Sequence, residues 1–236
     1  GSTQGFANGT GTAAQFDGPQ GIAVDAAGNV YVADERNHVI RKITPAGVVS
    51  TLAGTDGKSD YRDGIGTAAW FSKPAGVAVD ASGNVYVADS ENNRIRKINA
   101  TTLEVTTLAG TTQGFADGVG TDAKFNKPEG VEVDASGNLY VGDTYNHKIR
   151  KITTSGMVST LAGSSEGFAD GDGSAAKFYY PIGVAVDASG IVYVAGDYDN
   201  RIRKIVQQSL TGTPTSAQIG AHTVALQLSD DKGGTV

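Results

Sequence analysis

The chain contains no cysteine and very little methionine, tryptophan or histidine. Its 236 residues include no Cys, one Met, one Trp and three His. Without Cys, neither a disulfide nor a thiolate metal site can form. No apolar stretch approaches the roughly 18 residues that a membrane-spanning helix needs, so we expect no membrane insertion. The net charge of −6 offers no overall attraction to nucleic acid.

What the chain has in abundance is repetition. A segment that begins Gly21-Ile-Ala-Val-Asp25 recurs from Gly76, Gly130 and Gly183, and each copy is followed by an Ile-Arg-Lys-Ile run. The aspartates at the fifth position lie 55, 54 and 53 residues apart: Asp25, Asp80, Asp134 and Asp187. A period in this range indicates a solenoid, a propeller or an array of small modules.

Inside one repeat every apolar run has the length and composition of a strand. In the second copy these runs are 76–80, 84–89, 94–98 and 105–110, and the first two are joined by a turn with Gly83 at its tip. Four such strands form one antiparallel sheet with two faces to bury. Radial stacking of four-stranded sheets is the β-propeller, so we predict an all-β fold of four antiparallel blades.

The repeat resembles a known family. Val-Asp-Ala-Ser-Gly-Asn-Val-Tyr-Val-Ala-Asp, then Asn-Arg-Ile-Arg-Lys-Ile and Thr-Leu-Ala-Gly, is similar to the NHL repeat over residues 1–205. The Gly-Phe-Ala-Asp-Gly segments between repeats resemble those of large secreted bacterial proteins. The resemblance implies a β-propeller, usually of six blades. Four repeats then form either a closed four-bladed ring or part of a larger ring.

The two ends of the chain depart from the repeat. We interpret 1–205 as four NHL-like repeats and 206–236 as a tail with one strand near 222–229, where Val224, Leu226 and Leu228 alternate with other residues. The tail resembles half of a bacterial immunoglobulin-like or cadherin-like module. The same strand is also suited to complete the fourth blade, or to pair with a neighbouring molecule in a homo-oligomer or filament. Because the chain starts in mid-repeat, we expect the full protein to be longer.

The loops on one face of the predicted propeller are long and varied, and binding sites concentrate on such loops. Aromatic residues that break the repeat fall there, beside Asn and Asp. Aromatic rings beside Asn and Asp are typical of sites for a glycan or a peptide. The candidate ligand-binding residues are Trp70, Tyr145, Asn146, Tyr179, Tyr180, Tyr198 and Asp199.

Catalysis, calcium binding and nucleic-acid binding receive less support. The resemblance includes lyases and lactonases that hold a metal near the central channel, but His38 and His147 fall on third strands two blades apart, and Glu132 is a single carboxylate on an innermost strand. The Asp170-Gly-Asp-Gly173 loop and its equivalents at Asp63 and Asp117 match no calcium-loop spacing, which leaves Ca²⁺ a weak candidate. The basic residues are spread along the third strands, where we expect Asp34, Asp89 and Asp143 to form surface ion pairs with them.

These observations lead to one preferred function. We predict a non-catalytic, extracellular module of a secreted or cell-surface bacterial protein that binds a protein or a carbohydrate on its long-loop face, without a cofactor. The alternative is a propeller enzyme of the lyase or lactonase type.

Overall fold

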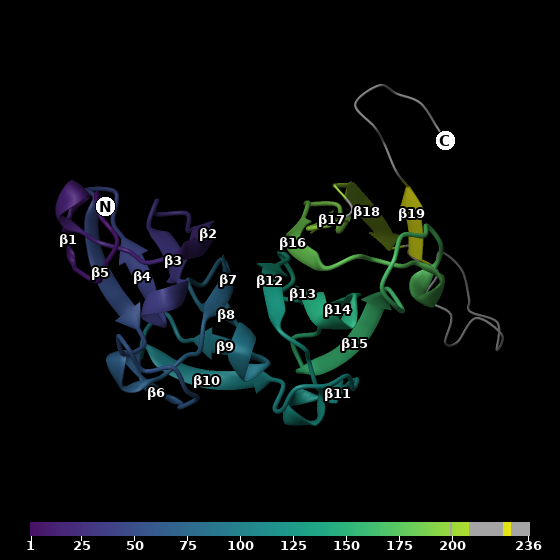
Figure 1. Ribbon diagram of the computed structural model, residues 1–236, viewed down its shortest axis with the longest axis horizontal. Helices are drawn as coiled ribbons and strands as arrows, with labels where there is room; N and C mark the ends of the chain where they lie inside the picture. The colour runs from purple at the N-terminus through teal and green to yellow at the C-terminus, as the bar shows by residue number, and fades with distance from the viewer. Residues whose placement is uncertain (199, 208–223, 228–236) are drawn as a thin grey trace, which may run out of the picture.

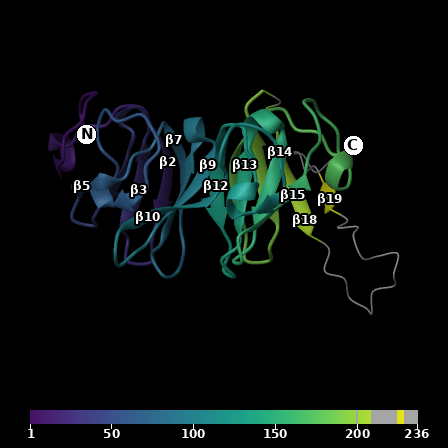
Figure 2. The same cartoon turned by 90° about the horizontal axis from the view of Figure 1, so that it is seen from below.

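The computed structural model describes residues 1–198, 200–207 and 224–227, and in these residues the protein is all-β. Four antiparallel sheets stand side by side as the blades of a β-propeller (Figures 1 and 2). The only helical segments described are single 3₁₀ turns, η1 to η7: Gly11–Ala13, Glu35–Asn37, Gly66–Ala68, Ser90–Asn92, Gly120–Asp122, Thr144–Asn146 and Gly173–Ala175. None of the described residues forms a helix long and apolar enough to cross a membrane.

Each sheet follows the chain from its innermost strand outward, and the first three sheets add a two-residue strand at the outer edge. From inside to outside, blade 1 is β2 (Pro19–Val24), β3 (Val30–Asp34), β4 (Val39–Ile43), β5 (Val48–Ala53) and β1 (Gly9–Thr10). Blade 2 is β7 (Pro74–Val79), β8 (Val85–Asp89), β9 (Arg94–Ile98), β10 (Glu104–Ala109) and β6 (Gly64–Ile65). Blade 3 is β12 (Pro128–Val133), β13 (Leu139–Asp143), β14 (Lys148–Ile152), β15 (Met157–Ala162) and β11 (Gly118–Val119).

Blade 4 has four strands: β16 (Pro181–Val186), β17 (Val192–Gly196), β18 (Ile202–Gln207) and β19 (Val224–Gln227). β19 runs antiparallel to β18, with Leu226 opposite Ile205 (Figure 1). Part of the predicted 222–229 strand therefore lies on the outer edge of its own chain's fourth blade. The division of the chain at residues 205 and 206 stays a prediction, and the rest of the tail lies outside the described residues.

The turn between the first two strands of a blade is closed by one aspartate. In blade 2 Asp80 accepts hydrogen bonds from the backbone N–H groups of Ser82 and Asn84, from the Asn84 side chain (2.8 Å) and from the Tyr86 hydroxyl (3.1 Å). Burial acts to raise the pKa of Asp80, but these hydrogen bonds lower it overall, and burial beside Asp80 raises the pKa of Tyr86 to about 12. The aspartate thus ties the turn to the second strand.

Neighbouring blades pack through apolar faces of two kinds. At the first junction one face of blade 1, with Tyr31, Ala33 and Ile40, packs against the facing side of blade 2, with Val85 and Ile98. The second and third junctions repeat this arrangement. Each junction buries its residues almost completely, which makes burial of apolar surface the main force that joins the blades.

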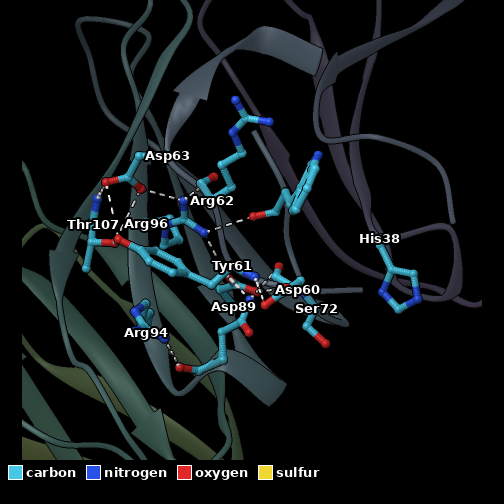
Figure 3. Close-up of polar contacts among 12 residues, drawn as sticks. His38, Asp60, Tyr61, Arg62, Asp63, Ser72, Asp89, Arg94, Arg96 and Thr107 are labelled. Carbon is cyan, nitrogen blue, oxygen red and sulfur yellow. Dashed lines mark hydrogen bonds and ion pairs between the residues drawn. The ribbon is translucent and has the colours of Figure 1, made fainter. Parts of the chain in front are cut away.

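The arginine of each Ile-Arg-Lys-Ile run is buried, which corrects the expectation of surface ion pairs. Arg96 lies 2.7 Å from the Asp89 carboxylate, and both side chains are fully buried. Its other nitrogen, Nη2, donates to the Asp63 carboxylate (2.6 Å) and to the Arg62 carbonyl (3.0 Å). Figure 3 shows Arg96 at the centre of these groups. Arg41 and Arg150 form the same buried pairs with Asp34 and Asp143.

Two aromatic rings flank each buried guanidinium. The centre of the Arg96 guanidinium lies 4.8 Å from the Tyr61 ring centroid and 5.2 Å from the Phe71 ring centroid. The corresponding ring pairs are Phe6 with Phe16, Phe115 with Phe125, and Phe168 with Phe178. These aromatic residues therefore connect the inter-blade loop to the third strand by cation–π contacts as well as by packing.

Removal of the carboxylate from one buried pair tests its contribution. Asp89→Ala leaves the Arg96 charge buried without its partner, and we expect it to lower the free energy of unfolding by about 3–5 kcal/mol. Asp122→Ala, at an exposed position, is the control and should change it by less than about 0.5 kcal/mol. The measurement is urea-induced unfolding followed by circular dichroism. Equal midpoints for the two variants would contradict a structural role for the pair.

Candidate functional site

Four tyrosines that break the repeat come together at the junction of blades 3 and 4. Tyr145 lies in η6, between the second and third strands of blade 3. Tyr179 and Tyr180 precede β16, and Tyr198 follows β17. They therefore come from three loops on the same face. We refer to these four residues as the tyrosine cluster.

The backbone around the cluster holds the rings in place. The N–H of Tyr145 donates to the Asn126 carbonyl (3.1 Å), and the Tyr180 carbonyl accepts from the N–H of Asp197 (3.0 Å). Tyr180 adopts a left-handed conformation with φ 47°, which is uncommon for a bulky residue. The equivalent residues Lys73 and Lys127 have the same φ, so the conformation belongs to the repeat and the tyrosine is particular to this junction.

The rings form a continuous aromatic surface centred on Tyr180. Its ring centroid lies 5.1 Å from that of Tyr145, 5.2 Å from Tyr179 and 5.3 Å from Tyr198. The His147 ring meets Tyr180 edge-on at 4.9 Å. Tyr145 and Tyr198 are exposed, at 45% and 62% of their surface, so part of the cluster is open to a ligand.

A hollow of about 320 Å³ opens at this cluster. It is lined by the four tyrosines together with Glu129, Thr144, Ile182 and Asp197. Burial raises the pKa of Glu129, and the nearby carboxylates of Asp197 and Glu35 raise it further. The hollow therefore combines aromatic faces with two acidic groups, and no basic residue lines it among the residues that the structure describes.

Two of the predicted site residues, Trp70 and Asn146, lie apart from this hollow or are engaged in other contacts. Trp70 lies in the loop before blade 2, where Arg62 and Lys58 pack over its ring and its carbonyl accepts from Arg96. The Asn146 amide is occupied by hydrogen bonds to the Gly114 carbonyl (2.8 Å) and the Asp143 carboxylate (2.9 Å). Asp199 lies outside the described residues. A ligand-binding role for any predicted residue stays a prediction.

The residues weighed for other chemistry are engaged within the fold. Asp63, Asp117 and Asp170, of the acidic loops, form ion pairs with Arg96, Arg150 and Arg203. Within the described ranges no group of three or more His, Asp or Glu side chains is placed to hold a metal ion. Glu132 lies half-buried on β12, where its carboxylate accepts the N–H of Val133 (2.9 Å) and burial raises its pKa.

Sequence reasoning did not select Glu129 or Asp197. Glu129 stands where the other innermost strands have Gln20, Ala75 and Ile182, and Asp197 stands where the other blades have Glu35, Ser90 and Thr144. A position-by-position comparison of the four repeats shows both of these departures and would have identified the two residues. Gly196 is a further departure, because it replaces the buried aspartate of the other blades; within the described residues Arg203 pairs with the Asp170 carboxylate (2.9 Å).

Comparison with known proteins agrees with the fold. The NHL repeat model matches residues 16–43, 71–98 and 125–152, so the protein carries NHL repeats. NHL repeat-containing protein 2 of Homo sapiens is 34% identical over 165 residues, which are 63% of this chain and 22% of that protein. The chain therefore spans about a fifth of the length of that relative.

Solved structures share the propeller architecture at low sequence identity. An auxiliary nutrient binding protein from Bacteroides ovatus superposes with a TM-score of 0.65 and 21% identity, and the match covers 83% of this chain and 50% of that one. A putative gluconolactonase gives a TM-score of 0.61 and 15% identity over 94% of this chain and 65% of that one. At these identities the likeness establishes the fold alone.

The junction of blades 1 and 2 contains a pH-sensitive hydrogen bond. His38 Nδ1 accepts the N–H of Lys73 (3.0 Å), and at the equivalent position of the next blade Asn93 Oδ1 accepts the N–H of Lys127 (2.9 Å). Burial, followed by the charge of Lys73, lowers the pKa of His38 below its ordinary 6.5. The stability that neutral His38 contributes is therefore complete above pH 6.5 and is lost as the pH falls through the lowered pKa.

We expect His38→Asn to keep the hydrogen bond and remove this part of the pH dependence. Between pH 7.5 and 5.0 the wild type should lose more unfolding free energy than the variant. His147, which makes a similar contact, is present in both proteins and cancels in the difference. Urea unfolding at the two pH values measures this, and identical losses would show that His38 does not titrate as described.

Proposed function

We propose that the protein is a non-catalytic binding module of an extracellular bacterial protein, and that its ligand is a glycan or a segment of another protein. The observation that carries the proposal is the convergence of the tyrosine cluster. Residues 145, 179, 180 and 198 break the repeat at separate places in the sequence and line one hollow in the fold. Packing between blades does not require exposed rings, whereas ligand stacking does.

The chemistry of the hollow supports binding more than catalysis. Its aromatic faces offer stacking surface, and the carboxylates of Glu129 and Asp197 are able to accept hydrogen bonds from a ligand. Within the described residues no histidine lines this hollow. An extracellular setting agrees with the resemblance of the inter-repeat segments to those of secreted bacterial proteins.

Glycan and peptide arrays test this function. We expect the wild type to bind a defined group of ligands, and we expect Tyr198→Ala to weaken that binding about tenfold or more, because the exposed ring contributes contact area without supporting the fold. Trp70→Ala is the comparison variant and should bind as the wild type does. Loss of binding in Trp70→Ala with full binding in Tyr198→Ala would place the ligand elsewhere.

The alternative is a propeller enzyme of the lyase or lactonase type, and Glu132 is the residue that favours it. Its carboxylate lies on an innermost strand and borders a hollow of about 300 Å³ along the four innermost strands. The raised pKa of Glu132 would suit a general acid. Bound transition metal in the purified protein, together with lyase or hydrolase turnover that Glu132→Ala abolishes, would establish the alternative and contradict the proposed function.

A further inference from the structure

We propose that the hollow at the tyrosine cluster binds an alkylammonium group, a positively charged nitrogen that carries methyl or alkylene substituents. The inference rests on the proposed function, because it names the class of ligand that the same site takes. Three features of the hollow support it: its acidic lining, the rings that no cation covers, and the residues that stand at the equivalent positions of the other repeats.

The charge of the hollow is unbalanced. Glu129 and Asp197 line it, and among the described residues no Lys, Arg or His does. Burial raises the pKa of Glu129, and the carboxylates of Asp197 and Glu35 raise it further, against the charge of Lys127, which lowers it. A cation bound in the hollow would offset this repulsion, whereas a neutral sugar would leave it in place.

Three of the four rings of the cluster lack the cation that accompanies most other aromatic residues in the described part of this protein. Arg94 packs 3.9 Å from the Tyr61 ring centroid, Lys148 packs 4.7 Å from that of Phe115, and Arg201 packs 3.8 Å from that of Phe168. Lys127 lies 5.4 Å from the Tyr145 centroid and pairs with Glu91 at 3.0 Å. In the described part of the chain no cation packs over Tyr179, Tyr180 or Tyr198.

Clusters of tyrosine rings with nearby carboxylates attract alkylammonium groups for a physical reason. The face of each ring is negative, and methyl or alkylene groups spread the positive charge over a surface that the rings can contact. A cation held in this way keeps part of its apolar surface out of water. A hollow of about 320 Å³ lies in the range of small-ligand sites, roughly 300–1,000 Å³.

The residues at the equivalent repeat positions explain how this hollow differs from the neighbouring one, which shares Glu129 and Tyr145 but is lined by Lys73 and Lys127. At the corresponding places the other blades carry Gly18, Lys73 and Lys127 for Tyr180, and Gln20 and Ala75 for Glu129. Lys73 and Lys127 would place positive charge where this junction has a ring. The same loop architecture therefore gives a cation-binding surface at one junction.

Isothermal titration with matched probes tests the inference. We expect the wild type to bind choline and a trimethyllysine peptide, and to bind 3,3-dimethyl-1-butanol, the neutral analogue of choline, at least tenfold more weakly. Tyr198→Phe should retain choline binding because it keeps the ring, whereas Tyr198→Ala should weaken it about tenfold. Glu129→Gln should weaken choline and leave the neutral analogue unchanged. Tighter binding of the peptide than of choline would indicate a protein ligand, and the reverse a small molecule or a lipid headgroup.

The outcomes separate this inference from the proposed function. Equal affinity for choline and its neutral analogue, or no binding of any cationic probe at millimolar concentration, would overturn the alkylammonium assignment. If an array ligand still bound and Tyr198→Ala still weakened it, the proposed function would stand without the inference. If Tyr198→Ala weakened neither choline binding nor binding of the array ligand, both the inference and the proposed function would be wrong.

Discussion

The architecture depends on a charged side chain in an apolar setting, the buried arginine of each third strand. A guanidinium is costly to remove from water unless its donors are satisfied. In blades 1 to 3 an aspartate at the end of the second strand accepts one donor, loop carbonyls accept others, and two aromatic rings cover the faces. These partners lie on the inter-blade loop as well as on the strands. One arginine therefore holds a Gly-rich loop that has little regular structure of its own.

This arrangement explains where the repeat is free to change. The aspartate also accepts a loop N–H, so Asp143 fixes Asn126 just before the innermost strand of blade 3. In blade 4 Gly196 takes the place of this aspartate, and Tyr179 takes the place of Asn126. The loop there lacks this carboxylate and carries rings that meet Tyr145 and Tyr198. The candidate site thus lies at the junction of blades 3 and 4, where blade 4 lacks the aspartate that pairs with the buried arginine in the other blades.

The sequence predicted the four blades, their strands and the face on which the unusual tyrosines lie, because all of these follow from period and local pattern. It did not predict the burial of Arg96, whose partners Trp70 and Arg62 lie 26 and 34 residues away. A strand that contains charged residues is predicted to be half-exposed at the edge of a sheet. Local spacing does not show that a loop distant in the sequence folds over such a strand. The two-residue outer strands were missed for the same reason, since Gly64–Ile65 is defined only by its pairing with β10. Trp70 broke the repeat as the tyrosines did, but the fold placed it in another loop.

A structure of the protein with choline bound tests the central claim most directly, namely that the tyrosine cluster is the ligand site and that its ligand is a cation. The account predicts the quaternary nitrogen within about 6 Å of the Tyr180 and Tyr198 ring centroids, on the side that Glu129 and Asp197 line. Density for the ligand along the innermost strands beside Glu132, with the tyrosine hollow filled only by water, would contradict it.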